Sequence, residues 1–580
     1  MPPFLCRKAK AVVQRALLAL AVGACALAWA PPASAQTGLP TLGDGSELGS
    51  SAERRLGDRI IRELYRDPDY IDDPVLEDYV QGLWQSLLAA ARARGELSAE
   101  LDERFAWEVL LGRDRSVNAF ALPGGYLGLH LGLVGVTSTR DELASVLAHE
   151  LSHVLQRHVS RLLTAQKKQT PLLLGALVLG ALAASKNPDA AQALVVGGRA
   201  LLLQNQLNFS RDMEREADRI GYGLMAPAGF APQGFVGMFD KLQQANRLND
   251  NGSWPYLRSH PLTTERSADM HARIPPGTTA IGATAAAPAT LEHALVAARA
   301  RVLANPGVDS LRQWIAEPQS SGWASQPLPH RAAALYVAAL GSSQLRDAAG
   351  ARAAAKKLDD LVSRHGSDVV GCAQPSERSA RRIAQPIPSV LASDATPRCA
   401  SMASADRQMI GDATLVHDAP DARQASDPAT RRLLGLLNAE IELAAGAADA
   451  ALQALQALPA GSDTGRPELL LRTRALLQAR RAGEGAQALQ TWVANHPKDA
   501  TAWQLLAAVA QAQGQTLRAV RAEAEAHAAR YDYAAAADRF KAGQDLARRS
   551  GAAVDHIDAS IIDTRLRAME SLLREQAAER

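Results

Sequence analysis

The sequence of 580 residues lacks three features that would each point to a particular class of protein. Its charges almost cancel, with 63 Lys and Arg against 61 Asp and Glu, so it has no electrostatic basis for binding nucleic acid. Its four cysteines include no CxxC pair, which argues against a cysteine-based zinc site. Its apolar stretches at 171–184 and 190–203 are shorter than the about 20 residues that a membrane-spanning helix needs.

The N-terminus has the pattern of a secretory signal peptide. Four basic residues precede an apolar run at 16–30, and the small residues Ala33-Ser34-Ala35 then offer a cleavage site. We therefore expect residues 1–35 to be removed, which takes the formal net charge from +2 to −2 because the four lost charges are all positive. An alternative is a lipid anchor on Cys25, but the apolar run continues past this residue, which favours cleavage after Ala35.

The sequence HELSH at 149–153 places two imidazoles and a carboxylate within five residues of an expected amphipathic helix. Successive helical residues are rotated by about 100°, so His149 and His153 lie one turn apart on the same face. Both rings can therefore bind one zinc ion. Glu150, beside them, is placed to take a proton from zinc-bound water.

A second expected helix carries a run of acidic residues, SRDMEREAD at 210–218. A catalytic zinc has three protein ligands and one open position, and Glu214 is our candidate for the third ligand. Asp218 lies one turn further along, where it could accept the ring N–H of a ligand histidine and fix its tautomer. Glu216 is expected on the solvated face of this helix.

Four blocks of the chain, in this order, resemble the M48 peptidases: NAFALPGG at 118–125, HELSH at 149–153, the acidic run at 210–218, and SHP at 259–261. The resemblance covers roughly residues 50 to 275. Together with the helical repeats further on, it extends to a periplasmic subgroup that assists the assembly of outer-membrane β-barrels. It implies one zinc ion per chain, with ligands His149, His153 and Glu214, catalytic base Glu150, and His260 close to the metal.

What the resemblance implies is a zinc-dependent endopeptidase in the periplasm of a Gram-negative bacterium. Its substrates would be unfolded or misassembled outer-membrane proteins, and its partner the β-barrel assembly machinery. The alternative is a chaperone or adaptor in which the repeats matter most and proteolysis is secondary. His260 could occupy the fourth zinc position and block it, or donate a hydrogen bond to the oxyanion; we expect the blocking role.

The expected fold is mainly α. Residues 36–274 would form a zincin-type α+β protease domain with a small sheet, because apolar residues alternate near 105–111 and again from Leu127. His130 is expected to be exposed on the second strand, and His158 to point away from the zinc ligands. After a low-complexity linker at 275–289, residues 290–580 read as an α-solenoid of tetratricopeptide-like repeats.

Two further segments carry expectations of their own. The repeats are interrupted at about 366–426, where Cys372 and Cys399 are expected to form a disulfide in an oxidising compartment. The two apolar stretches within 171–203 are expected to form a helical hairpin over or beside the zinc site. Peripheral contact of this hairpin with a membrane surface is the alternative.

Overall fold

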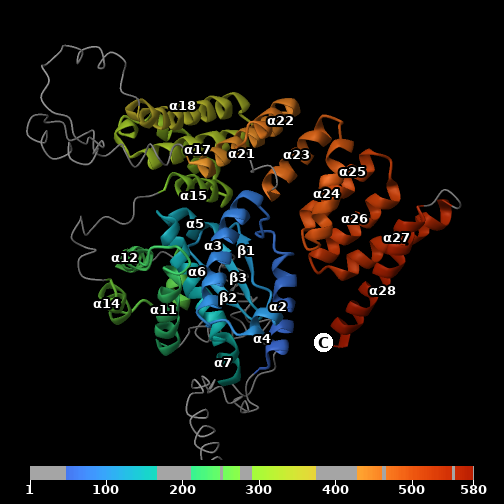
Figure 1. The fold of residues 1–580 in the computed structure, drawn as a ribbon, viewed down its shortest axis with the longest axis horizontal. Coiled ribbons are helices and arrows are strands. Elements are labelled where there is room, and N and C mark those ends of the chain that lie inside the picture. The colour runs from blue at the N-terminus through green and yellow to red at the C-terminus, as the bar shows by residue number, and fades with distance from the viewer. Residues whose placement is uncertain are drawn as a thin grey trace, which may run out of the picture. The chain divides into compact units, whose positions relative to one another are not determined.

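The computed structural model describes residues 48–165, 211–247, 253–274, 290–373, 427–459, 465–550 and 555–578. The described chain is mainly helical with one small sheet, and its C-terminal half consists of paired helices, which confirms the predicted fold class (Figure 1). The signal peptide with Cys25, residues 171–203, the linker, Cys399 and the side chain of Cys372 lie outside the described residues. No helix in the described part of the chain has both the length and the apolar composition needed to cross a membrane.

The N-terminal half, up to residue 274, contains ten described helices and three strands. The helices are α2 (Ser50–Leu64), α3 (Pro74–Ala93), α4 (Ala99–Arg104), α5 (Leu131–Val136), α6 (Arg140–Leu155), α7 (His158–Ala165), α11 (Arg211–Met225), α12 (Gln233–Arg247), α13 (Tyr256–Ser259) and α14 (Thr264–Ala272). The strands are β1 (Glu108–Gly112), β2 (Ala119–Leu122) and β3 (Tyr126–His130).

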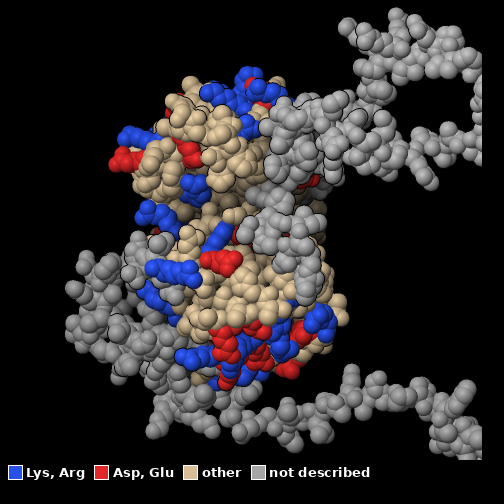
Figure 2. Space-filling model, turned by 90° about the vertical axis from the view of Figure 1, so that its left-hand side faces the viewer, with Lys and Arg blue, Asp and Glu red and all other residues tan. Residues whose placement is uncertain are grey.

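In the C-terminal half, from residue 290 and here called the repeat half after the predicted repeats, the described residues form helices and no strands. They are α15 (Leu291–Leu303), α16 (Val308–Ala316), η1 (Glu317–Gln319), η2 (Trp323–Ser325), α17 (Leu328–Gln344), α18 (Ala348–Ala373), α21 (Pro428–Ala444), α22 (Ala448–Gln456), α23 (Arg466–Gln478), α24 (Gly483–Asn495), α25 (Ala500–Ala512), α26 (Thr516–Ala529), α27 (Tyr533–Ser550) and α28 (His556–Ala578). Acidic and basic side chains gather together at the lower end of the face drawn in Figure 2, so their charges offset one another there.

The sheet has the order β1-β3-β2, with β1 parallel and β2 antiparallel to β3. The sequence predicted β1 and β3 but not β2, which lies within the NAFALPGG block. The alternation that starts at Leu127 continues through Leu131 and Leu133, which predicts a longer second strand, but the chain turns into α5 directly after β3. The β2–β3 turn needs glycine at Gly125, where φ is +85° and a Cβ atom would lie 2.7 Å from Phe105 Cβ.

Helix α6, which carries HELSH, is buried around almost its whole circumference. It packs against α3, α11, α12 and β2, and every residue from Glu142 to Leu155 is buried. Thr139 caps its start by accepting a hydrogen bond from the Glu142 N–H at 3.1 Å. The Glu142 carboxylate in turn accepts one from the Ser138 N–H at 2.6 Å, so both side chains satisfy backbone donors at this end. The helix is therefore a rigid support for its side chains.

The repeat half is fastened to the first turns of α3 by arginines from three different helices. Each binds one or two acidic residues within 72–78 at 2.6 to 2.8 Å: Arg299 of α15 binds Asp73, Arg432 of α21 binds Asp78, and Arg466 of α23 binds Asp72 and Glu77. One hydrophobic core runs from Ile71 to Leu471 across both halves. Residues 49–580 accordingly form one compact unit.

His293 on α15 makes this junction sensitive to acid. It is fully buried, with Nδ1 2.8 Å from the Tyr79 hydroxyl and Nε2 3.1 Å from the Thr137 carbonyl oxygen. Burial, with a smaller contribution from the Lys241 ammonium, lowers the pKa of His293 to about 4. Because the folded protein disfavours the charged ring, the contribution of His293 to the free energy of unfolding is fully present above its unfolded pKa of about 6.5. This contribution is lost as the pH falls toward 4.

We therefore expect His293→Gln to flatten the acid dependence of stability. From these two pKa values, His293 should account for about 2 kcal/mol of the stability lost between pH 7.5 and pH 5. The measurement is the unfolding midpoint of wild type and variant across this range, with the exposed His330→Gln as control. An unchanged slope in His293→Gln would contradict the prediction.

Candidate metal centre

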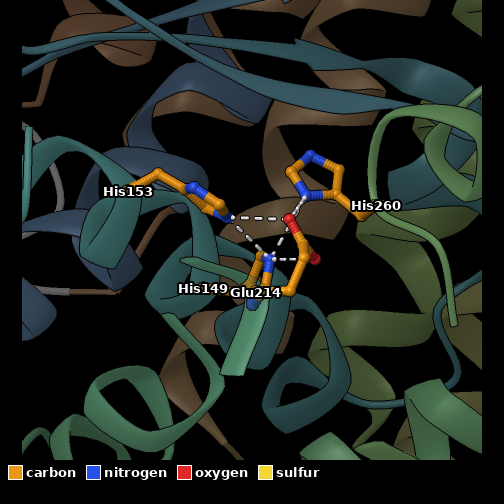
Figure 3. Close-up of side chains that lie close together, drawn as sticks. All are labelled: His149, His153, Glu214 and His260. Atoms are coloured by element: carbon orange, nitrogen blue, oxygen red, sulfur yellow. Dashed lines mark hydrogen bonds and ion pairs between the residues drawn. The ribbon is translucent and has the colours of Figure 1, made fainter. Parts of the chain in front are cut away.

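The histidines of HELSH and the first acid of the second motif converge because α6 and α11 lie very close together. Gly221 of α11 permits this approach, since a Cβ atom there would lie 3.0 Å from the Ala148 carbonyl oxygen. His149 Nε2 and His153 Nε2 are 3.0 Å apart. The two carboxylate oxygens of Glu214 each lie 3.5 Å from one of these nitrogens. All three side chains are buried, and they point toward one another (Figure 3).

His260 supplies a fourth donor atom to the same point. It follows α13, and its ring stacks on Tyr256 with centroids 4.6 Å apart. His260 Nδ1 lies 3.0 Å from Glu214 Oε1 and 3.3 Å from His149 Nε2. The four donor atoms all lie within 4.8 Å of one another. A tetrahedral zinc site with bonds of about 2.0–2.1 Å has ligand atoms about 3.4 Å apart, so these spacings fit such a site.

The buried charges at this cluster also fit a divalent cation. Glu150, Glu214 and Asp218 are each at most 1% exposed. Among the described residues, the buried cation that contacts them is Arg266, which binds both oxygens of Asp218 at 2.7 and 2.8 Å and Glu214 Oε2 at 2.7 Å. With the imidazoles neutral and the carboxylates ionised, the three negative charges and one positive charge leave −2, which a dication would neutralise.

The raised pKa of His149 also indicates excess negative charge at the cluster. Burial by itself would lower its pKa, but the carboxylates of Asp218 and Glu214 raise it to about 10. Asp218 Oδ1 lies 3.0 Å from His149 Nδ1. The position of Asp218, one helix turn beyond Glu214, suggested this contact. Excess negative charge therefore draws either a proton or a metal ion to the Nε2 side of this ring.

Glu150 lies beside the four donor atoms without being one of them. Its Oε2 accepts a hydrogen bond from the Ala121 N–H at 3.0 Å, and its Oε1 lies 3.4 Å from His260 Nε2. Burial raises the pKa of Glu150, although the neighbouring rings of His260 and His149 oppose the shift. A carboxylate with a raised pKa binds a proton more readily than an ordinary glutamate, as a general base requires.

Residues 82–274 match the family model described as peptidase family M48. This part of the chain is similar to peptidase family M48. A Vibrio cholerae relative is 36% identical over 268 residues, 45% of this chain and 52% of the relative. The beta-barrel assembly-enhancing protease of Escherichia coli is 33% identical over 266 residues, 46% of this chain and 52% of that protein. The mitochondrial metalloendopeptidase OMA1 of Arabidopsis thaliana is 34% identical over 196 residues, 34% and 36% of the two chains. The chain spans about half the length of the beta-barrel assembly-enhancing proteases that it matches.

Two expectations about histidines near the cluster were wrong. His130 is 5% exposed and hydrogen-bonds Ser116 Oγ at 2.9 Å, so it is buried, although it lies outside the metal cluster. His158 does not point away from the ligands: its Nδ1 lies 2.9 Å from His153 Nδ1. A continuous helix would turn it away, but Arg157 adopts φ +52°, ends α6 and brings His158 back against it.

Glu216 was expected on the solvated face of α11, and it is partly exposed there, but it also binds two neighbouring side chains. Its Oε2 lies 3.1 Å from His158 Nε2 and 3.1 Å from Arg161 Nη1. The carboxylate is 31% exposed, so one side of it does reach solvent. Arg266 was not predicted at all, because no short motif links it to residues 48 positions earlier in the chain.

Proposed function

We propose that this chain is a zinc-dependent endopeptidase of the cell envelope. The observation that carries the proposal is the group of four buried donor atoms, from His149, His153, Glu214 and His260, with the Glu150 carboxylate beside them. The match of residues 82–274 to the model of peptidase family M48 supports it. The matched relatives named as proteases support it as well.

In this proposal His149, His153 and Glu214 hold the zinc ion, which when bound supplies a Lewis acid that polarises a peptide carbonyl and acidifies water. Glu150 takes the proton from the attacking water and returns it to the leaving amine. The Ala121 N–H holds the Glu150 carboxylate in place at 3.0 Å. Asp218 accepts the Nδ1–H of His149, which leaves the Nε2 lone pair directed at the cluster.

The substrate would bind along β2, the strand beside Glu150. β2 is an edge strand, whereas β3 is the central strand of the sheet. The Ala121 N–H points away from β3 toward Glu150, so the same edge faces the site. An extended polypeptide paired with this edge would be bound through its backbone, with little dependence on sequence. Such binding suits a protease for misassembled proteins.

The substrate class and partners follow by analogy with the Escherichia coli relative, whose name refers to beta-barrel assembly. Misassembled outer-membrane proteins would be the substrates, the β-barrel assembly machinery the partner, and the periplasm the compartment. The second candidate function is that of a chaperone or adaptor built on the tetratricopeptide-like repeats. It is favoured by the large share of the chain that the paired C-terminal helices occupy.

Full-length Glu150→Gln separates the two functions. In cells that lack the wild-type gene, an endopeptidase predicts that this variant leaves the envelope defect uncorrected. An adaptor predicts full correction by the same variant. Deleting residues 290–580 would be a poorer test, because it would uncover the buried junction around Asp73 and Tyr79.

His260→Ala should raise cleavage of an unfolded substrate and increase self-cleavage, with zinc retained. The reason is that His260 Nδ1 lies among the donor atoms, where it would take the position needed by water or the substrate carbonyl. If His260 instead stabilises the oxyanion, the variant should be roughly 10² to 10³ times slower. The measurement is kcat/KM together with zinc content, with the exposed His271→Ala as control. Slower turnover at unchanged zinc affinity would exclude the blocking role.

A further inference from the structure

We infer that His158 and Glu216 act as positioning residues for His153, fixing the tautomer in which its Nε2 atom can bind a metal. This inference rests on the proposed function, since it concerns how a ligand of the proposed zinc site is prepared. His153 presents Nε2 to His149 and Glu214, so its Nδ1 faces the opposite side. There it meets His158 Nδ1 at 2.9 Å, and His158 is fully buried.

A hydrogen bond between two neutral imidazoles requires one nitrogen to carry the hydrogen and the other to accept it. If His158 Nδ1 carried the hydrogen, His153 Nδ1 would be the acceptor. The hydrogen of neutral His153 would then sit on Nε2, and that atom could not bind a metal. The direction of this single hydrogen bond therefore decides whether His153 can act as a ligand.

Glu216 sets the direction. An ionised carboxylate can only accept hydrogen bonds, and Glu216 Oε2 lies 3.1 Å from His158 Nε2. His158 therefore carries its hydrogen on Nε2, and its Nδ1 accepts the hydrogen bond from His153 Nδ1–H. Arg161 binds the same carboxylate oxygen at 3.1 Å, which favours the ionised form.

Each of the two ligand histidines is thus linked, through its Nδ1 atom, to a carboxylate of α11. His149 reaches Asp218 directly at 3.0 Å, whereas His153 reaches Glu216 through His158. The difference follows from the helix geometry: Glu216 lies two residues from Asp218, on another side of α11, and the turn at Arg157 places an imidazole in the gap. The ring of His158 therefore connects His153 on α6 with Glu216 on α11.

The test measures the zinc affinity of purified full-length protein by competition with a chelator. His158→Leu removes the acceptor and should bind zinc about 10 to 100 times more weakly. His158→Asn places an amide oxygen near the position of Nδ1 and should recover most of the affinity. Glu216→Ala should also weaken binding, whereas Asp212→Ala should not, since Asp212 is an exposed acid on the same helix. The absorption spectrum of the cobalt-loaded protein should change in His158→Leu and Glu216→Ala but not in Asp212→Ala.

Three outcomes would overturn the inference. One is a zinc affinity of His158→Leu within about twofold of wild type. A second is equally weak binding by His158→Asn and His158→Leu, which would make the effect one of packing. The third is no effect of Glu216→Ala on either affinity or spectrum. The unfolding midpoint of each metal-free variant shows that it is folded, and if His158→Leu is not, the Asn and Glu216 variants decide the matter. Wild-type protein that binds no zinc would instead refute the proposed function.

Discussion

Glu150→Gln should lower kcat for an unfolded protein substrate by roughly 10³-fold while leaving one zinc ion per chain. The glutamine side chain has almost the same shape and can still accept the hydrogen bond from the Ala121 N–H, so the site should keep its geometry. What it cannot do is take a proton from water. Glu150 is not one of the four converging donor atoms, which is why zinc should remain.

The assay for this prediction combines cleavage of a fluorescently labelled unfolded protein with metal analysis of the same sample. Glu265→Gln, an exposed glutamate on α14, is the matched control and should behave as wild type. Cleavage by Glu150→Gln within about tenfold of wild type would show that another group is the base.

Glu214→Ala should lose zinc and, with it, all cleavage. Glu214 contributes a carboxylate oxygen at 3.0 Å from His260 Nδ1 and 3.5 Å from His153 Nε2, and its removal also halves the −2 charge of the cluster. We expect zinc affinity to fall by more than the about 10- to 100-fold that is typical of losing an outer hydrogen-bond partner. Asp218→Asn, which alters such a partner of His149, should fall within that range.

Comparing Glu214→Ala with His260→Ala identifies the third ligand, because both residues supply atoms to the cluster. Zinc dissociation constants from chelator competition are the measurement. If Glu214→Ala binds zinc and cleaves normally while His260→Ala loses the metal, the carboxylate is not the third ligand. The metal-free unfolding midpoint of each variant separates lost binding from lost folding.

Local spacing was enough to identify the pairs of residues that share one helix turn. His149 and His153 lie four residues apart on α6, and Glu214 and Asp218 lie four apart on α11, so each pair faces one way as soon as its helix forms. The capping residue Thr139 likewise acts within three residues. These interactions depend only on backbone geometry that neighbouring residues specify, and the sequence reveals them.

Where a helix ends is harder to predict, and this explains the error at His158. The prediction continued α6 through Arg157, whereas Arg157 adopts a left-handed conformation held by contacts to Glu53 at 2.9 Å and Ser160 at 3.3 Å. Glu53 lies more than a hundred positions earlier in the chain, so no local pattern signals the turn. β2 was missed for a related reason: four residues beside a glycine turn become a strand only when β3 pairs with them.

The sequence by itself therefore determined the candidate donor residues, the helical character of both halves and the order of the motifs. Only the tertiary structure decided which atoms meet: the close approach of α6 and α11 at Gly221, the salt bridges from Arg266 to Asp218 and Glu214, and the arginines of the repeat half on residues 72–78. The physical reason is that these contacts join segments separated by tens to hundreds of residues. Their strength depends on burial and charge that exist only once both segments are folded together.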